Sequence, residues 1–343
     1  MAMTILAVLL GVSYLSFVIN PAKVWLITLF GLAFFPLLVI NLILLVWAIF
    51  RKSKAFLIPL VAVLPCIFFV NSYIQLFPSS TSEQVDADLK VVSYNLGRFS
   101  LGNTEGVANK NECADSIFAY LKRQDADIIC LQEFYLKKGK LKSYIREHFP
   151  GYHAEYYMYT GANGLFGNVT LSKMPVSDKG VIKFEKSANL AIFTDYKVGD
   201  RRFRVYNCHF ESYNISLAGL TKALFRVDHE VVTETGEKMK KSISRRPKQV
   251  DQVFSHIESC PYQAFVCGDF NDNPMSYTYY RMTRGRNDAF VEGGSGLGAT
   301  YSHFWPFLRI DYVLVPEEYE PINCEIHKVK FSDHYPVVAD IKF

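Results

Sequence analysis

Several patterns that mark common kinds of site are missing from this chain of 343 residues. It has no closely spaced cluster of histidine and cysteine, which disfavours a zinc site. It has no glycine-rich phosphate-binding loop and no serine within a nucleophile elbow. Its seven cysteines follow no spacing that specifies a disulfide framework. The chemistry of this protein must therefore come from other side chains.

Charge is scarce as well, but only at the start of the chain. The charged residues of segment 1–83 are Lys23, Arg51, Lys52, Lys54 and Glu83. Three apolar stretches occupy this segment, at roughly 3–20, 24–50 and 55–77. A helix needs about 20 residues to cross the hydrocarbon core of a bilayer. The pattern predicts about three transmembrane helices within residues 1–78.

The basic segment "FRKSKAF" predicts how such helices would be oriented. Arg51, Lys52 and Lys54 form the basic cluster of a short loop, and basic loops stay in the cytoplasm. The third helix would then deliver the rest of the chain to the extracytoplasmic side through a polar linker at 79–88. The sequence thus predicts a multi-pass membrane protein with the lipid bilayer as a partner and an outer domain at 89–343.

The outer domain is nearly neutral. From Gln84 onward, 33 Lys and Arg residues stand against 32 Asp and Glu residues. A protein that grips nucleic acid without sequence preference usually has a strong positive excess, so avid binding of that kind is disfavoured. One basic run, "EKMKKSISRRPKQ" at 237–249, is either solvated surface or a face for phosphate or anionic lipid. Arg246 in this run is a candidate for binding substrate.

Short strand-like runs alternate with helical ones in the outer domain. The strand candidates, rich in Val, Ile, Phe and Tyr, are 89–96, 126–134, 203–212, 262–271 and 309–315. Segments 111–124 and 245–259 read as amphipathic helices. The domain is therefore expected to be α/β.

Polar residues interrupt these apolar runs at equivalent places. Asn95, Glu133, His209, Asp269 and Asp311 each lie within or at the end of a strand candidate. Burial of a carboxylate or an imidazole without partners costs several kcal/mol, so such groups are normally paired or bound to metal. One such residue is more often a satisfied core group, but five at equivalent positions indicate a common site.

If the five residues converge with "FSDHYP" at 331–336, they make an oxygen-rich site. Asp333 and His334 would join them, as would Asn271 of "CGDFNDNP". Carboxylate and amide oxygens in this number suit a hard cation such as Mg²⁺ or Mn²⁺. A hard cation, a carboxylate able to deprotonate water and a carboxylate-paired imidazole suit hydrolysis of a phosphate ester.

These residues also carry a resemblance. In order, "SYNLGRF", "DIICLQEF", "GNVTLSKMPV", "YNCHFES", "CGDFNDNP", "RIDYVLV" and "SDHYPVVADI" are similar to successive motifs of the endonuclease/exonuclease/phosphatase superfamily, which has the deoxyribonuclease fold. The similarity covers about residues 88–343. It implies two mixed β-sheets packed as a sandwich, flanked by helices, with the site at one end. A further pattern, "SYTYY…DAFVEGGSGLGATYS", resembles membrane-anchored bacterial members, which would place the protein in a bacterial inner or cell membrane.

The resemblance also implies a role for each residue. Glu133 would bind the metal, with help from Asn95 and Asp333. Asp269 would orient or deprotonate the attacking water, and Asn271 would hold a phosphate oxygen. His334 would contact the phosphate with support from Asp311. His209 would bind the phosphate or assist the leaving oxygen.

The expected function is therefore a metal-dependent phosphoesterase, most directly a phosphodiesterase or nuclease-type hydrolase. Its substrate would be nucleic acid, a phospholipid or inositol-type headgroup, or a small phosphate ester. The histidine of "CHFES" departs from the tyrosine-bearing strand typical of abasic-site endonucleases, which disfavours DNA repair. A catalytically silent scaffold of the same fold is the alternative from another class, but Glu133, Asp269 and His334 are all retained.

Overall fold

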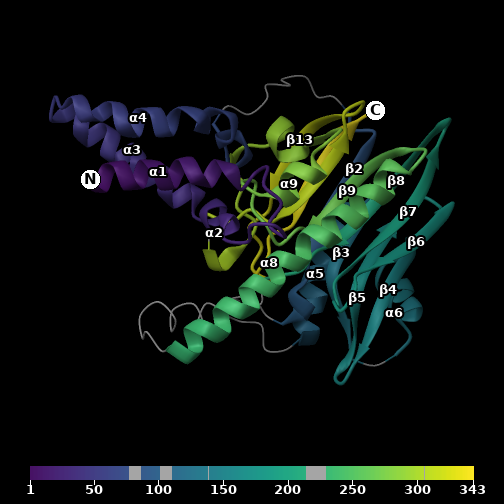
Figure 1. Cartoon of the computed structure of the whole chain (residues 1–343). Coiled ribbons are helices and arrows are strands. Elements are labelled where there is room, and N and C mark those ends of the chain that lie inside the picture. The colour runs from purple at the N-terminus through teal and green to yellow at the C-terminus, as the bar shows by residue number, and fades with distance from the viewer. Residues whose placement is uncertain (77–85, 101–109, 138, 214–228, 305) are drawn as a thin grey trace. The chain divides into compact units, whose positions relative to one another are not determined.

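Figure 1 presents a computed structural model of the whole chain. The described residues are 1–76, 86–100, 110–137, 139–213, 229–304 and 306–343. They form two compact units. The helical unit comprises 1–74, 211–252 and 271–281, and the sandwich unit comprises 75–210, 253–270 and 282–343. Most of the predicted linker 79–88 lies outside the described residues, as do residues 214–228.

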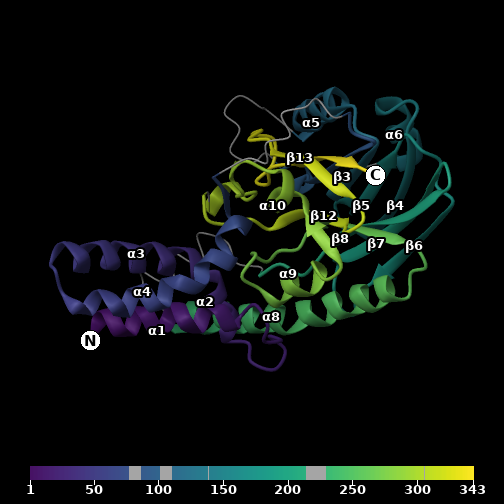
Figure 2. The same cartoon turned by 90° about the horizontal axis from the view of Figure 1, so that it is seen from above.

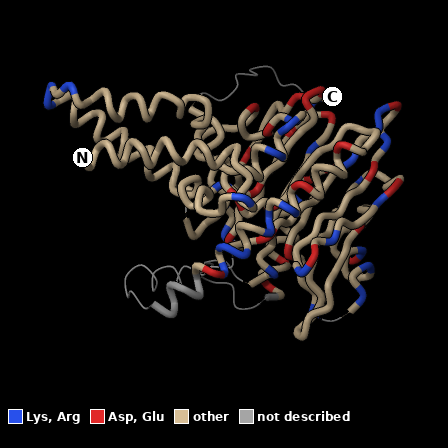
Figure 3. Tube along the Cα trace, in the orientation of Figure 1, with Lys and Arg blue, Asp and Glu red and all other residues tan. Residues whose placement is uncertain are grey.

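The helical unit is built from short apolar helices. They are α1 (Ala2–Leu15), α2 (Ile27–Leu32), α3 (Phe34–Phe50) and α4 (Leu57–Val63), with 3₁₀ turns at Lys54–Phe56, Leu64–Phe68 and Val70–Ser72. Its core includes Leu10, Phe34 and Val63. Buried Asn41 joins α3 to α1, because its Nδ2 donates to the Leu6 carbonyl at 3.1 Å as well as to that of Leu37 at 2.9 Å. Figure 3 shows these helices as an almost uncharged trace with basic residues at the turn between α3 and α4.

The predicted transmembrane helices are wrong. Among the residues that the structure describes, no helix combines the length and the apolar character that crossing a membrane requires. The apolar stretches 3–20, 24–50 and 55–77 are divided into pieces, of which the longest, α3, has 17 residues. The third stretch breaks into α4 and 3₁₀ turns, in which Pro59 and Pro65 lack the N–H that a continuous helix needs. The predicted membrane location, the orientation and the lipid bilayer as a partner all depended on these spans and are withdrawn with them.

The sandwich unit contains two six-stranded mixed sheets. The first sheet has the spatial order β13 (Glu320–Ile326), β14 (Val337–Lys342), β2 (Leu89–Asn95), β3 (Ile128–Leu136), β5 (Gly164–Ser172), β4 (His153–Gly161). The second has the order β10 (Arg286–Asp288), β12 (Asp311–Pro316), β9 (Gln263–Asp269), β8 (Arg201–His209), β7 (Leu190–Val198), β6 (Asp178–Lys183). Each sheet has one parallel pair, β2 with β3 and β8 with β9, among antiparallel neighbours.

Helices cover the outer faces of the sheets, as Figures 1 and 2 show. The helices α5 (Lys110–Gln124) and α6 (Leu141–His148) pack on the first sheet around Ile117, Phe118 and Ile145. The end of α8 (His229–Glu258) lies on the second sheet, where His256 contacts Tyr206. The other described elements are short: α9 (Tyr277–Met282), α10 (Ala289–Gly293), β1 (Ile74–Gln75), β11 (Gly296–Leu297) and the 3₁₀ turns Gly97–Phe99 and Ser302–Phe304.

Apolar side chains between the sheets form the inner core. Val91, Cys130, Phe203, Cys267 and Val313 are among its fully buried members. Strands that face packed layers on both sides are expected to be mainly apolar, and the centres of these strands are, although buried amides such as Asn207 interrupt them. The predicted sandwich of two mixed sheets with helices outside is confirmed, and it fixes where the polar strand ends must lie.

Candidate active site

The second sheet aligns three of the predicted residues at one edge. His209, the last residue of β8, pairs with Asp269, the last residue of β9. Asp269 pairs in turn with Asp311, the first residue of β12. Gly268 allows the close approach of β8 and β9, because a Cβ there would lie 1.9 Å from the Cys208 carbonyl oxygen. Cross-strand partners share a face of the sheet, so the three polar side chains lie together.

Asn95 connects the first sheet to this row. It is the last residue of β2 and is buried. Its Nδ2 donates a 2.8 Å hydrogen bond to Asp269 Oδ2, and its Oδ1 accepts one from the Gly97 backbone N–H at 3.0 Å. A buried carboxylate is thereby held by an amide from the opposite sheet, which fixes one of its oxygens.

Glu133 occupies a strained position in β3. The pairing of β3 with β5 shifts between Leu131 and Phe134, so one extra residue bulges from the strand. Glu133 there has φ of 50°, in the left-handed region that a residue with a side chain seldom adopts. Bulges of this kind redirect side chains and are common beside active sites. The Glu133 carboxylate accepts a 3.1 Å hydrogen bond from Arg98 Nε and lies 3.7 Å from His209 Nε2.

His334 and Asp311 form a buried pair. The His334 Nδ1 lies 2.9 and 3.1 Å from the two Asp311 carboxylate oxygens, and its Nε2 lies 3.9 Å from Asp269 Oδ2. Burial by itself lowers the pKa of His334, but the Asp311 and Asp269 carboxylates outweigh burial and hold this pKa well above its ordinary value. The two carboxylates therefore favour the protonated ring.

The loop before β14 brings Asp333 to the same end of the sandwich. Ser332 Oγ donates to the Asn95 carbonyl oxygen at 2.8 Å, and accepts from the His334 backbone N–H at 3.2 Å. Gly97, with φ of 53°, admits Asp333, because a Cβ there would lie 2.9 Å from Asp333 Oδ1. These contacts hold the loop against the end of β2, where Asn95 lies.

The remaining predicted residues, Asn271 and Arg246, belong to the helical unit. Arg246 is buried, lies 3.0 Å from Asp272 Oδ2 through Nη1, donates from Nε to the Glu211 carbonyl at 2.7 Å and stacks on the Tyr213 ring. Asn271 follows β9 with φ of 52°, which asparagine tolerates better than most residues. The other seven predicted residues are brought together by the sandwich unit.

Sequence reasoning missed a polar network behind these residues. Gln132 Nε2 donates to Asn207 Oδ1 at 2.8 Å, and Asn168 Nδ2 donates to the Asn207 carbonyl at 3.1 Å, so side chains of the first sheet bond to the second. All three residues are fully or almost fully buried. The available signal was an amide inside each apolar run, but an amide alone does not say which strand it faces.

Tyr301 and Arg98 were missed as well. Tyr301 pairs with His334 in an isolated bridge, and their rings meet edge to face at 5.1 Å. Burial, followed by the nearby Asp333 and Asp269 carboxylates, raises the pKa of Tyr301 to about 12. Tyr301 therefore stays neutral, whereas the Arg98 guanidinium forms an ion pair with the Glu133 carboxylate.

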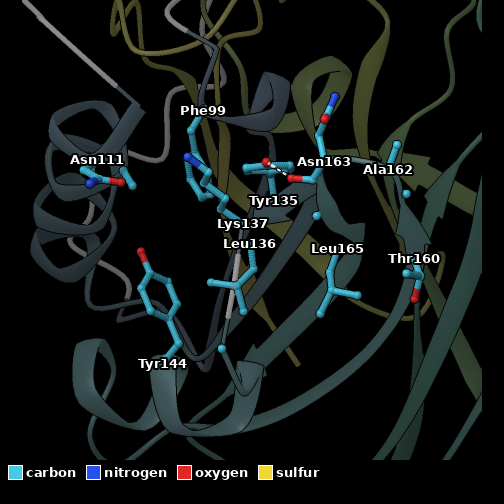
Figure 4. Close-up of a pocket in the computed structure, with 14 residues that line it drawn as sticks. Phe99, Asn111, Tyr135, Leu136, Lys137, Tyr144, Thr160, Ala162, Asn163 and Leu165 are labelled. Atoms are coloured by element: carbon cyan, nitrogen blue, oxygen red, sulfur yellow. Dashed lines mark hydrogen bonds between the residues drawn. The ribbon is translucent and has the colours of Figure 1, made fainter.

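A separate cavity of about 1150 Å³ opens on the helix side of the first sheet (Figure 4). Its walls include Asn111 of α5, Tyr144 of α6, Leu136 of β3 and Asn163 of the β4–β5 turn. None of the predicted site residues lines it. Its mixed apolar and amide walls hold no concentration of acids, so the chemistry lies with the strand ends.

The two-sheet sandwich with acids and histidines at one end is the architecture that the sequence motifs imply. The profile of the Endonuclease/Exonuclease/phosphatase family matches residues 92–334, and the chain belongs to this family. Residues 1–73 match a second profile, described as a domain of unknown function (DUF8431). No curated protein sequence matches the chain.

Solved structures share the fold. An endonuclease/exonuclease/phosphatase from Beutenbergia cavernae is 18% identical over 75% of this chain and 72% of its own, with a TM-score of 0.55. The human Nocturnin catalytic domain with bound sulfate is 17% identical over 78% and 100%, with a TM-score of 0.53. TDP2 of D. rerio, complexed with a single strand DNA product, is 15% identical over 74% and 99%, with a TM-score of 0.52. At these identities the similarity shows the fold alone.

Proposed function

We propose that the sandwich unit hydrolyses a phosphate ester bond, most directly that of a phosphodiester, with the help of a divalent cation. Members of the family are generally hydrolases of phosphate esters. The observation that carries the proposal is the buried His334–Asp311 pair directly beside Asp269. A protonated imidazole next to a second carboxylate supplies both a donor for an anionic oxygen and an acceptor for the proton of water.

His334 has a defined part in this scheme. Asp311 engages Nδ1, so Nε2 remains as the donor toward a phosphate oxygen. A cationic donor in a buried site stabilises the charge that builds on the phosphoryl oxygens in the transition state. Asp311 acts through His334 as a positioning residue.

Asp269 is the proposed acceptor of the water proton. Asn95 holds its Oδ2, which orients the carboxylate. His209 Nε2 lies 3.7 Å from both Asp269 Oδ2 and Glu133 Oε1, where it would bind phosphate or assist the leaving oxygen. Asn271 and Arg246, which belong to the helical unit, remain predictions from the sequence.

The donor set fits a divalent cation. Among the described residues at this end of the sandwich, the carboxylates are Glu133, Asp269, Asp311 and Asp333, and the cations near them are His334 and Arg98. Asp269, Asp311 and His334 also offer three ligand atoms within 4.8 Å of one another, but a cation there would break the His334–Asp311 hydrogen bonds. We therefore assign Mg²⁺ or Mn²⁺ to Glu133, with Asn95 and Asp333. When bound, the cation would polarise the phosphate and neutralise its charge.

The test is hydrolysis by the purified full chain. Bis-p-nitrophenyl phosphate, DNA, RNA, sphingomyelin and phosphoinositides would be offered with Mg²⁺, with Mn²⁺ and with EDTA. We expect turnover of at least one substrate that EDTA abolishes and added metal restores. Full activity after the metal has been demonstrably removed would refute the cation, and inactivity on every substrate would refute the hydrolase.

A further inference from the structure

The row of site residues in the second sheet continues to the edge of that sheet. His209 pairs with Leu190 on β7, and Leu190 pairs with Lys183, the last residue of β6. Lys183 is exposed, whereas Leu190 is buried. The same end of the sheet that holds Asp269 therefore carries a cation on the edge strand β6.

The first sheet carries a matching row of rings. Tyr157 of β4 pairs with Asn168 of β5, and Tyr159 pairs with Phe166. Asn168 donates to the Asn207 carbonyl in the second sheet, so this face of β4 and β5 looks toward the second sheet. The three rings are half-buried and not closed into the core.

The rings form a continuous strip between two cations. Arg98 reaches from Glu133 to the Phe166 ring, with its Cζ 4.9 Å from the ring centroid. The Phe166 and Tyr159 centroids are 6.0 Å apart, and those of Tyr159 and Tyr157 are 5.2 Å apart. Lys183 Nζ lies 4.3 Å from the Tyr157 centroid. We call Arg98, Phe166, Tyr159, Tyr157 and Lys183 the aromatic strip.

This composition selects for a particular kind of ligand. Single-stranded nucleic acid binds to rows of aromatic side chains, on which its bases stack, next to cations that contact its phosphates. A polyol headgroup is recognised mainly through its hydroxyl groups, and an acyl chain gains nothing from two flanking cations. The side chain of Arg98 is 52% exposed, so the guanidinium next to Glu133 is accessible to a ligand.

We propose that the aromatic strip is a base-stacking subsite, which makes single-stranded nucleic acid the substrate class of the neighbouring site. The proposal rests on the proposed function, because the strip would hold the nucleotides next to the phosphate that is cleaved. Modest net charge is compatible with it, since the rings and not a broad basic surface supply the affinity.

The experiment is binding of a fluorescein-labelled oligodeoxythymidylate to the full chain in EDTA, where metal-dependent turnover is absent. Tyr157→Leu and Tyr159→Leu should each weaken binding about tenfold, the range for loss of one stacked base. Tyr157→Phe keeps the ring and should bind within about twofold of wild type. Tyr156→Leu alters the opposite face of the same strand, which packs on the α5–α6 side, and serves as the matched control for damage to β4.

A cation variant adds a second readout. Lys183→Gln should lower the slope of log affinity against log salt by about one, as expected for one lost phosphate contact. Equal binding by Tyr157→Leu and wild type, no binding by wild type, or tighter binding to phosphoinositide vesicles than to the oligomer would each overturn the proposal. Ring-dependent binding without hydrolysis of any substrate would instead refute the proposed function and leave the strip standing.

Discussion

The sandwich unit contains two buried charged clusters that differ in balance. On the outer face of the second sheet, Asp195 accepts hydrogen bonds from Arg204 Nε at 2.5 Å and Nη2 at 2.7 Å. Arg204 also lies over the Phe193 ring, and its hydrogen bonds with Asp195 hold its pKa above the ordinary value. Asp195 is matched there by one bidentate donor, and the exposed Asp178 lies 3.9 Å from the same guanidinium.

The strand-end cluster is not balanced in this way. Among the described residues, Asp269 and Asp311 both lie within 4 Å of the His334 ring, and Glu133 accepts a hydrogen bond from the exposed Arg98. Acids in excess of cations destabilise a buried site unless a ligand compensates them. On this comparison, the Asp195–Arg204 pair stabilises the fold, whereas the strand-end cluster is arranged for a reaction. The predictions below test this difference in role.

The largest effect is expected at Glu133. Glu133→Gln keeps the shape and removes the charge, so hydrolysis should fall by orders of magnitude while the fold persists. Calorimetric titration with Mn²⁺ should show weaker binding at the same time, because an anionic ligand has been lost. Unchanged Mn²⁺ affinity would place the metal elsewhere, with the Asp269, Asp311 and His334 set as the next assignment.

The next effect is expected at the His334–Asp311 pair. His334→Ala should lower kcat about 10²-fold or more, in the range of a lost acid–base or electrostatic group. Asp311→Asn should cost a comparable factor, and the double variant should be scarcely slower than either single variant, because the two act as one unit. Near-normal turnover by both single variants, with unfolding of the double variant, would identify the pair as structural.

The strand ends were predictable because burial makes a polar residue conspicuous in an apolar run. Asn95, Asp269 and Asp311 carried that signal, and parallel or antiparallel pairing then placed them together. The bulge at Glu133 was not predictable, since its backbone shift depends on the pairing with β5. The same holds for Asn168 and Asn207, whose contacts cross between the sheets.

The prediction for the helical unit was wrong for a different reason. Apolar composition shows that a segment avoids water, but it does not show where a helix ends. Trp47 and Phe50 of α3 are largely exposed, so the apolar pattern is real. The breaks at Ala33 and at residues 64–72 are features of chain geometry that hydropathy does not record.

A smaller effect, on stability and not on activity, is expected at the balanced pair. Asp195→Asn removes the bidentate carboxylate of Arg204 and should lower the free energy of unfolding by roughly 3 kcal/mol. Urea denaturation of the full chain measures this, with Glu155→Gln as the matched control. Glu155 pairs with the exposed Lys179 at 2.6 Å, and loss of such a surface pair costs about 0–1 kcal/mol. Turnover by folded Asp195→Asn should equal that of wild type, and a large loss of kcat would end the distinction between the clusters.

The smallest effect is a contrast in pH dependence between the two clusters. Burial, reinforced by Arg204, lowers the pKa of His256 below its ordinary 6.5, whereas the carboxylates raise that of His334 above it. The unfolded chain therefore binds more protons than the folded chain at His256, so this residue costs stability as pH falls through about 6.5. The opposite holds at His334, whose contribution is complete below pH 6.5 and is lost as pH rises toward its folded pKa.

Thermal unfolding in EDTA of wild type, His256→Gln and His334→Gln from pH 5.5 to 8.5 would separate the two histidines. The amount by which the unfolding temperature of wild type exceeds that of His334→Gln should shrink by a few degrees as pH rises. The corresponding difference between wild type and His256→Gln should shrink as pH falls. Trends of the same sign in both variants would show that the two histidines are held by the same kind of cluster.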